Sequence, residues 1–219
     1  MKKWIVGCCG GCLILTLLMV VAGVLAVRWL DEAPRSWETE VSLEVAAEPA
    51  EVRALVEDLR RWPSWSAWAR ERAQGVERSY SGLERGVGAI YEWKATTDRT
   101  EQEVGAGRIE IRSAGPDSIE YLATHHGALC IASDSEVGGI ETRSQVHLIE
   151  FDHEYLVPGS FRFEDTERGC RVTWRESVDL GDSLVAKFLG VVVLPVATQV
   201  HRATLERSLQ GLKDAVELR

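Results

Sequence analysis

Residues 61–69 read RWPSWSAWA, and this stretch decides the fold that we predict. It spaces three tryptophans at three-residue intervals around a proline, so a short helix would stack Trp62, Trp65 and Trp68 along one side. The rings have two interpretations: they form an aromatic rim that stacks on an entering ligand, or they lock short helices onto the edge of a sheet. We favour the packing role for Trp62 and Trp65 and leave both roles open for Trp68.

The sequence on either side of this stretch has the patterns of an α+β domain. Upstream, residues 38–45 alternate polar and apolar side chains, which predicts a strand, and a helix begins at Pro49. Downstream, the same alternation predicts strands at 89–95, 104–112, 117–123, 144–151, 160–163 and 171–180. A long helix is predicted from about residue 183 to 217, with a kink at Pro195. The expected fold is a curved antiparallel sheet around a long C-terminal helix.

The N-terminal segment predicts a membrane span. Between Trp4 and Leu30 the only charged residue is Arg28. As a helix this interval would be roughly 38 Å long, which exceeds the hydrocarbon core of about 30 Å, and tryptophans near its two ends suit the membrane interfaces. We therefore predict a transmembrane anchor at residues 1–30, a linker at 31–36 and one folded domain at 37–219.

The orientation of this anchor follows from the charges beside it. Lys2 and Lys3 favour a cytoplasmic N-terminus, although Arg28 and Arg35 weaken the asymmetry, so we expect the folded domain in the periplasm or outside the cell. A cleaved signal peptide is the alternative, because residues 24–26 are small enough for a signal peptidase. Its apolar run would be longer than usual.

The charge balance excludes one large class of partner. The formal net charge is −9, and every acidic residue lies at or beyond Asp31. A protein that binds nucleic acid needs the opposite sign to neutralise phosphates. Anionic lipid headgroups would repel such a domain as well, so we expect it not to lie flat on a membrane.

Further motifs accompany the tryptophan stretch in a fixed order. They are YSG at 80–82, GVGA at 86–89, YEW at 91–93, GAGRIEI at 105–111, VTW at 172–174 and GLK at 211–213. In order and spacing, over roughly residues 41–217, this set resembles the bacterial SRPBCC proteins, also called the polyketide cyclase/dehydrase or START-like group. Many members of that group begin, as this chain does, with a short membrane helix. Residues 125–150 depart from the resemblance, because short relatives lack this insertion.

The resemblance implies a helix-grip fold whose cavity, between the sheet and the C-terminal helix, takes hydrophobic molecules such as lipids, sterols or polyketides. Inward-facing aromatic residues are core by default, but in such a fold they would line the cavity. The expected ligand-binding residues are Trp68, Tyr91, Trp93, Ile109, Tyr121, Phe161, Trp174 and Phe188.

The sequence predicts no metal, no cofactor and no catalytic group. Its five histidines do not show a metal-binding spacing, and His125 and His126 would point to opposite faces of a strand. There is no nucleophile elbow, no phosphate-binding loop and no dinucleotide fingerprint. Paired carboxylates cannot be recognised, because 34 acidic residues make coincidental pairs inevitable.

Three functions remain open on these grounds. The first is a membrane-tethered, non-catalytic protein that binds a small hydrophobic ligand, such as a lipid or a polyketide. The second is a cyclase or dehydratase, which requires at least two polar side chains to converge inside the cavity. The third is a partner-binding module with a filled core, which the absence of a pocket above roughly 300 Å³ would favour.

Overall fold

The computed structural model contains two compact units, residues 1–35 with 180–194 and residues 36–179 with 195–219. The structure describes residues 19–21, 23–25, 28–29, 31–32, 36–67, 76–96, 103–127, 131–137, 140–146, 154–181, 187, 191 and 194–218. Everything below refers to these residues.

The first unit holds most of the predicted membrane anchor. Its described residues 19–21, 23–25 and 28–29 are helical, and Lys187 forms an ion pair with Asp31. Of the described residues, none belongs to a helix that is both long enough and apolar enough to cross a membrane. Most of the predicted span, including residues 1–18, lies outside the described residues, so the anchor stays a prediction.

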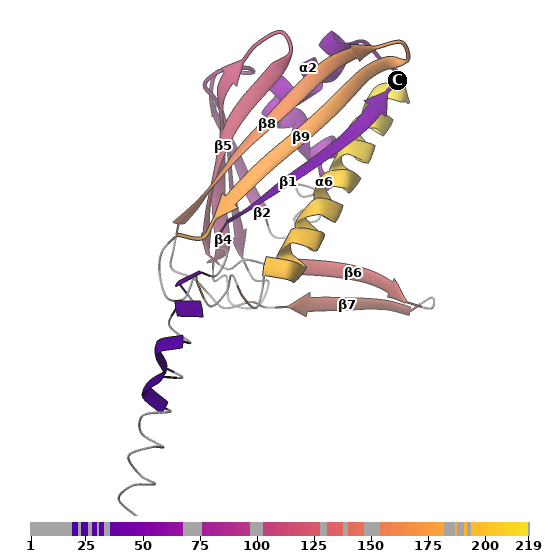
Figure 1. The fold of residues 1–219 in the computed structure, drawn as a ribbon. Coiled ribbons are helices and arrows are strands. Elements are labelled where there is room, and N and C mark those ends of the chain that lie inside the picture. Colours follow the sequence, from indigo (N-terminus) through magenta and orange to yellow (C-terminus); the bar gives the residue numbers. More distant parts are fainter. Residues whose placement is uncertain are drawn as a thin grey trace, which may run out of the picture. The chain divides into compact units, whose positions relative to one another are not determined.

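The second unit is built on a seven-stranded antiparallel sheet in the order β1-β9-β8-β5-β4-β3-β2 (Figure 1). Its strands are β1 (Ser36–Val45), β2 (Val76–Gly82), β3 (Ala89–Thr96), β4 (Glu103–Ala114), β5 (Ser118–Gly127), β8 (Glu154–Thr166) and β9 (Gly169–Asp179). A separate hairpin of β6 (Ile131–Val137) and β7 (Ile140–Val146) occupies most of the predicted insertion. From β2 to β9, each strand of this sheet pairs with the next strand of the sheet along the chain, and β1 pairs with β9 at the other end of the order.

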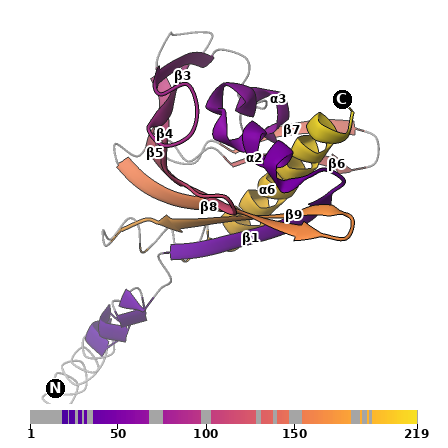
Figure 2. The same ribbon diagram turned by 90° about the horizontal axis from the view of Figure 1, so that it is seen from above.

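The helices of this unit lie on one side of the sheet. They are α2 (Pro49–Glu57), the 3₁₀ turn η1 (Leu59–Arg61), α3 (Trp62–Trp65) and α6 (Leu194–Glu217). Seen from above, the sheet bends between β5 and β8, and α2, α3 and α6 lie in the angle of the bend (Figure 2). A curved antiparallel sheet with a C-terminal helix against it is the arrangement expected of a helix-grip fold.

The alternation of side chains explains which face of the sheet meets the helices. Along β9, Val172, Trp174 and Val178 are buried, and their neighbours point to solvent. Apolar and aromatic residues of the other strands are buried as well: Tyr91, Trp93, Ile109, Ile111, Ile119, Tyr121, Phe161 and Phe163. On α6 the buried stripe consists of Leu205, Leu209 and Leu212, at the spacing predicted for a packed helix.

The prediction of the strands was wrong in two places. β2 was not predicted, because its residues show no buried position and therefore no apolar alternation. The described part of the predicted strand at 144–151, up to Val146, belongs to β7 of the separate hairpin, and residues 147–153 lie outside the described residues. The number of strands in the sheet nevertheless agrees with the prediction, since β2 takes the remaining edge position.

The C-terminal helix is described from Leu194 onward. α6 ends at Glu217, close to the predicted end, and Lys187 and Val191, inside the predicted range from residue 183, are also helical. The kink at Pro195 stays a prediction, because residues 192–193 lie outside the described residues. The apolar residues at positions 185, 188, 189 and 192 of the predicted helix lie outside the described residues.

Candidate functional site

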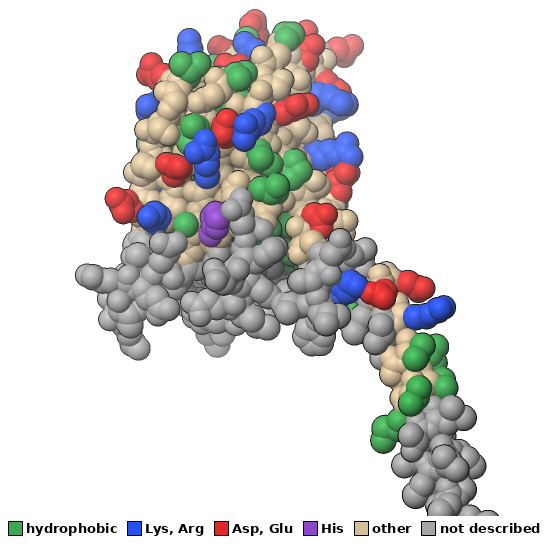
Figure 3. Space-filling view, turned by 90° about the vertical axis from the view of Figure 1, so that its left-hand side faces the viewer, with side chains coloured by type: hydrophobic (Ala, Val, Ile, Leu, Met, Phe, Trp, Pro, Cys, Tyr) green, Lys and Arg blue, Asp and Glu red, His purple; other side chains and the backbone are tan. Residues whose placement is uncertain are grey.

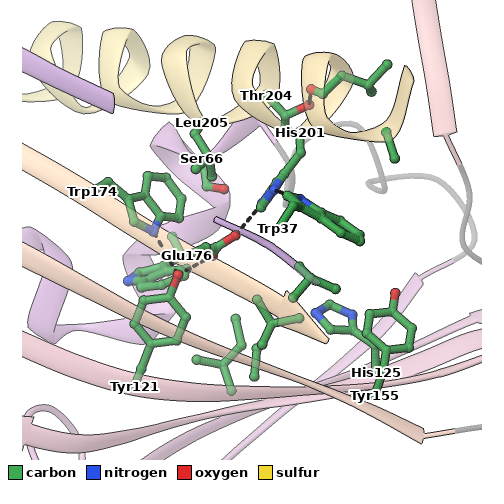
Figure 4. A pocket seen from close by; sticks show the side chains of 17 residues that line it. Trp37, Ser66, Tyr121, His125, Tyr155, Trp174, Glu176, His201, Thr204 and Leu205 are labelled. Atoms are coloured by element: carbon green, nitrogen blue, oxygen red, sulfur yellow. Dashed lines mark hydrogen bonds and ion pairs between the residues drawn. The ribbon is translucent and has the colours of Figure 1, made fainter. Parts of the chain in front are cut away.

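A cavity of about 140 Å³ lies between the inner face of the sheet and α6. Side chains from β1, β4, β5, β8, β9 and α6 line it, together with residues of α3 and the turn that follows. Its aromatic lining consists of Trp37, Trp62, Tyr121, Tyr155 and Trp174, and its ionisable lining includes His125, Glu176 and His201. The cavity is thus apolar over most of its wall and polar at particular points (Figure 4).

Trp62 closes one wall of the cavity. The ring is almost fully buried and lies edge-on to Tyr121 at a centroid distance of 5.5 Å and to Trp174 at 6.1 Å. Its indole N–H donates to the carbonyl oxygen of Val56 over 2.9 Å, so the polar atom of this ring is satisfied within α2. The tryptophan stretch therefore holds the short helices against the sheet, as the packing interpretation predicted, and also contributes a cavity wall.

A hydrogen-bonded chain runs along the wall of the cavity. The Trp174 Nε1–H donates to the Tyr121 hydroxyl oxygen over 2.7 Å, and the Tyr121 hydroxyl in turn donates to Glu176 Oε1. The other carboxylate oxygen, Oε2, is 2.5 Å from His201 Nε2. In Figure 4 the side chains of Tyr121 and His201 point toward Glu176 from the sheet and from α6, respectively.

The positions of the protons in this chain follow from its two ends. An indole N–H can only donate, and Trp37 Nε1 lies 3.1 Å from His201 Nδ1, so that nitrogen must be an acceptor. The ring then carries its proton on Nε2, where it donates to Glu176, and His201 is neutral. The Thr39 hydroxyl lies 3.2 Å from the same Nδ1 and is the second polar group there. Glu176 is thus a carboxylate that accepts hydrogen bonds from two neutral groups.

The register of the sheet brings the residues of this hydrogen-bonded chain together. Tyr121 on β5 pairs with Gly159 on β8, Gly159 pairs with Glu176 on β9, and Glu176 pairs with Thr39 on β1. Neighbouring strands are about 4.8 Å apart, so the Tyr121 side chain must cross the Gly159 position to reach Glu176. A Cβ atom on Gly159 would overlap the Tyr121 ring and its hydroxyl oxygen. The glycine therefore provides the space in which the tyrosine lies.

The side chains of this hydrogen-bonded chain are largely buried, which is unusual for a carboxylate. The side chains of Glu176 and His201 are only 12% and 19% exposed, and Tyr121 is buried. Burial, followed by the neighbouring Glu176 carboxylate, raises the pKa of Tyr121 well above its ordinary value, so the phenol keeps its proton. Among the described residues that line the cavity, none is Lys or Arg. The buried carboxylate of Glu176 is thus available to accept hydrogen bonds from a ligand.

A second pair of rings lies away from the carboxylate. His125 and Tyr155 stack with a centroid distance of 5.1 Å and an interplanar angle of 13°, and both line the cavity. They are direct partners across β5 and β8, in the row where Trp93 on β3 lies against Gly107 on β4. The cavity wall at this position thus consists of flat aromatic surfaces (Figure 4).

The predicted site residues divide into three groups. Ile109, Tyr121 and Trp174 line the cavity. Tyr91, Trp93 and Phe161 are buried in the core but are not among the residues that line it; Tyr91, for example, stacks on Tyr80 at 5.2 Å. Trp68 and Phe188 lie outside the described residues.

Sequence reasoning missed Glu176, His201 and Trp37, although a signal for the first two is present. Glu176 lies midway between Trp174 and Val178 in the alternation of β9, so it occupies an inward position. His201 lies four residues before Leu205, on the buried stripe of α6. An ionisable residue on an apolar face is the informative pattern in each case. As for metals, the described residues contain no group of three or more His, Cys, Asp or Glu side chains that could hold an ion.

No family model matches the chain, and no curated protein matches it either. Among solved structures, protein CV1439 from Chromobacterium violaceum is similar, with 12% identity, a TM-score of 0.49, and 82% of this chain and 97% of that chain covered. Ara h 8.0201 is 12% identical over 84% of this chain and 99% of that chain, with a TM-score of 0.48. The di-domain ARO/CYC BexL from the BE-7585A biosynthetic pathway is 16% identical over 88% of this chain and 54% of that chain, with a TM-score of 0.49. Likeness at this level carries no functional conclusion, and the SRPBCC resemblance of the motifs stays a prediction.

Proposed function

We propose that this chain is a ligand-binding helix-grip protein whose cavity takes one small, largely apolar molecule. The observation that carries the proposal is the cavity between the sheet and α6, with five Tyr and Trp side chains in its wall and a buried carboxylate beside them. Sites for small molecules typically combine an apolar wall with a few placed polar groups in this way.

The volume limits the size of the ligand. The cavity measures about 140 Å³, whereas pockets for drug-sized ligands measure about 300–1,000 Å³. A cavity of about 150 Å³ in another protein holds a benzene molecule. We therefore propose a ligand of one ring, rather than the whole lipid or polyketide that the sequence suggested.

The cavity is also smaller than the roughly 300 Å³ below which we expected a partner-binding module with a filled core. The buried, hydrogen-bonded Glu176 nevertheless argues against that function. Burying a carboxylate costs stability, and its hydrogen bonds offset only part of that cost. A filled core that only supports a docking surface would be more stable with an apolar residue in place of Glu176.

Ligand binding can be tested with a series of rings of increasing size. Toluene, naphthalene and a four-ring polyketide would be added to the full-length chain in mild detergent, and the thermal midpoint of unfolding recorded. We expect the single ring to raise the midpoint and the four-ring compound to leave it unchanged, because only ligands of the native state stabilise it. Equal shifts of the midpoint with all three compounds, or no shift with any of them, would contradict the proposal.

A matched pair of variants locates the binding. Ala123 lines the cavity, so Ala123→Leu should fill part of it and abolish the shift with toluene. Ala106 lies on the less buried face of β4, outside the cavity lining, so Ala106→Leu should preserve that shift. If both variants retain it, the ligand binds elsewhere.

We propose further that residues 1–30 tether the domain to a membrane, with the domain on the periplasmic or extracellular side. Support comes from the described helical residues of this segment, whose apolar side chains are exposed: Met19 by 69%, Leu25 by 61% and Trp29 by 60% (Figure 3). Exposed apolar side chains gathered on one helix are typical of a segment that contacts a membrane. Alkaline carbonate extraction should leave the chain in the membrane fraction, and recovery in the supernatant would contradict the tether.

A second candidate function is an enzyme that moves a proton on the ligand. The observation that favours it is the convergence of Tyr121, Glu176 and His201 at the cavity, since a carboxylate and a hydroxyl can act as base and acid. Such an enzyme would catalyse exchange of the protons next to a ketone. Incubation with cyclohexanone in heavy water, followed by NMR, should show exchange that Glu176→Gln removes. Equal exchange rates with and without the protein would contradict the enzymatic function, and ligand binding would remain as the proposed function.

A further inference from the structure

We infer that the cavity selects a cationic ligand: a single ring that carries a protonated amine, with Glu176 as the group that recognises the charge. The inference rests on the proposed binding function and adds to it the chemical class of the ligand. It excludes carboxylates and phosphates from this site.

The first argument is the unbalanced charge of the site. Glu176 is a carboxylate, and its two hydrogen-bonding partners, Tyr121 and His201, are both neutral. Trp37 keeps His201 neutral, because a proton on Nδ1 would face the indole N–H that now donates to that atom. Within the described residues no Lys or Arg lines the cavity, so the negative charge has no fixed counter-charge there. A desolvated carboxylate of this kind is stabilised most by a cation.

The second argument is the unused hydrogen-bonding capacity of the carboxylate. Two carboxylate oxygens offer about four lone-pair positions, and the chain occupies one position on each oxygen. A ligand ammonium group can therefore bind without displacing Tyr121 or His201. An anionic ligand would be repelled by the Glu176 carboxylate and by the negative faces of the aromatic rings in the same wall.

The third argument is the aromatic wall. Trp37, Trp62, Tyr121, Tyr155 and Trp174 all line the same small volume as Glu176. The negative faces of such rings attract organic cations, and rings around an ammonium group are a recurrent recognition device. The carboxylate and the aromatic wall reinforce each other. Glu176 provides the charge, and the rings provide apolar contact for the ligand's ring and a weak attraction for its cation.

Three probes of one shape separate charge from size. Benzylamine, benzyl alcohol and benzoate each consist of one ring and one short polar arm, with a positive, neutral and negative charge at pH 7. Each would be titrated into the full-length chain in mild detergent, with binding followed by tryptophan fluorescence and by the thermal midpoint. We expect benzylamine to bind about tenfold or more tightly than benzyl alcohol, and benzoate to bind least, since hydrogen bonds to charged groups are about twice as strong as neutral ones.

Variants assign the preference to Glu176. Glu176→Gln keeps the size of the side chain and removes its charge, so the preference for benzylamine over benzyl alcohol should fall to less than about threefold. Glu40 lies on β1 and is exposed, so Glu40→Gln removes the same charge from the surface and should keep the full preference. If Glu176→Gln does not fold, the order of the three probes on the unaltered chain still decides the question.

The outcomes distinguish the two levels of the proposal. Binding of all three probes with equal affinity, or tightest binding of benzoate, overturns the cationic ligand and leaves the binding function intact. Binding of none of them overturns both. A benzylamine preference that survives Glu176→Gln, or that disappears at 0.5 M salt, assigns the cation to an exposed surface carboxylate and overturns the inference, because salt screens exposed charges far more than buried ones.

Discussion

The inner side of this sheet has two regions that use the same kinds of residue differently. In the packed region, Phe161 stacks on Phe163 and lies 4.6 Å from Trp174 between ring centroids, and rings fill the available volume. In the cavity region, Glu176 on β9 and His201 on α6 lie among the rings, and space remains unfilled. Since close packing is the general state of protein interiors, the unfilled and polar region is the one that needs a functional explanation.

The boundary between the regions passes through single side chains. Trp62 and Trp174 belong to both, because each packs against Phe161 on one side and lines the cavity on the other. Rigid rings at the boundary hold the cavity open, since they cannot collapse into it without leaving their own packing. The packed region thus supports the geometry of the cavity region.

The largest effect should come from the packed region. Phe161→Ala removes a ring that is 1% exposed and contacts several other rings, so we expect the free energy of unfolding to fall by about 3–5 kcal/mol. Denaturation by urea, followed by circular dichroism, measures this loss. Phe161→Leu should cost clearly less, because it leaves a smaller hole. A loss below about 1 kcal/mol for the alanine variant would show that the two regions do not differ in packing.

A methyl group at the junction of the regions should have a smaller but more specific effect. Gly159→Ala places a Cβ atom where the Tyr121 ring now lies, so the ring must move away from Glu176. We expect a loss of about 1–3 kcal/mol of stability, together with a weaker preference for benzylamine. Gly115→Ala is the control, since its Cβ would find its nearest neighbours at 3.7 Å, and there the change should be neutral or slightly stabilising. Equal effects of the two substitutions would refute the role of Gly159.

The two regions also differ in how they could be read from sequence. Alternation along β9 and the stripe on α6 predicted the buried faces correctly, since burial depends on a local period of two or 3.6 residues. β2 escaped prediction because an edge strand without buried residues has no such period. The predicted site residue Phe161 proved to lie in the packed region, since alternation identifies the inner face but not the part of it that is left open.

The polar chain depends on contacts that no local pattern encodes. Tyr121 and Glu176 are 55 residues apart, and they meet only because Gly159 lies between them in the register of three strands. His201 reaches Glu176 from a separate helix. Sequence can mark each residue as polar on an apolar face, but pairing the two requires the register and the position of α6.

A pH experiment sharpens the comparison further. Burial raises the pKa of Tyr121, so above pH of about 10 the phenol ionises in the unfolded chain before it does in the folded one. The folded state then holds more protons than the unfolded state, and stability falls with rising pH by up to about 1.4 kcal/mol per pH unit. Tyr121→Phe should lack this part of the fall, as denaturation at pH 9, 10 and 11 will show. Tyr80, whose pKa burial also raises, is present in both proteins and cancels. Identical slopes would contradict the buried phenol.

The smallest effect on stability should follow Trp37→Phe, which keeps a ring and removes the N–H that donates to His201 Nδ1. We expect the loss of one hydrogen bond to cost about 1 kcal/mol. Its spectroscopic effect should be larger than its energetic one, because the indole holds the imidazole in a single tautomer with the proton on Nε2. In ¹⁵N NMR spectra the two ring nitrogens of His201 should resonate far apart in the unaltered protein and closer together in the variant. Thr39 remains beside Nδ1 and can still donate to it, so Thr39→Val combined with Trp37→Phe should complete the change. If the separation of the two resonances survives both substitutions, Glu176 alone orients the histidine, and the cavity does not depend on Trp37 for its negative charge.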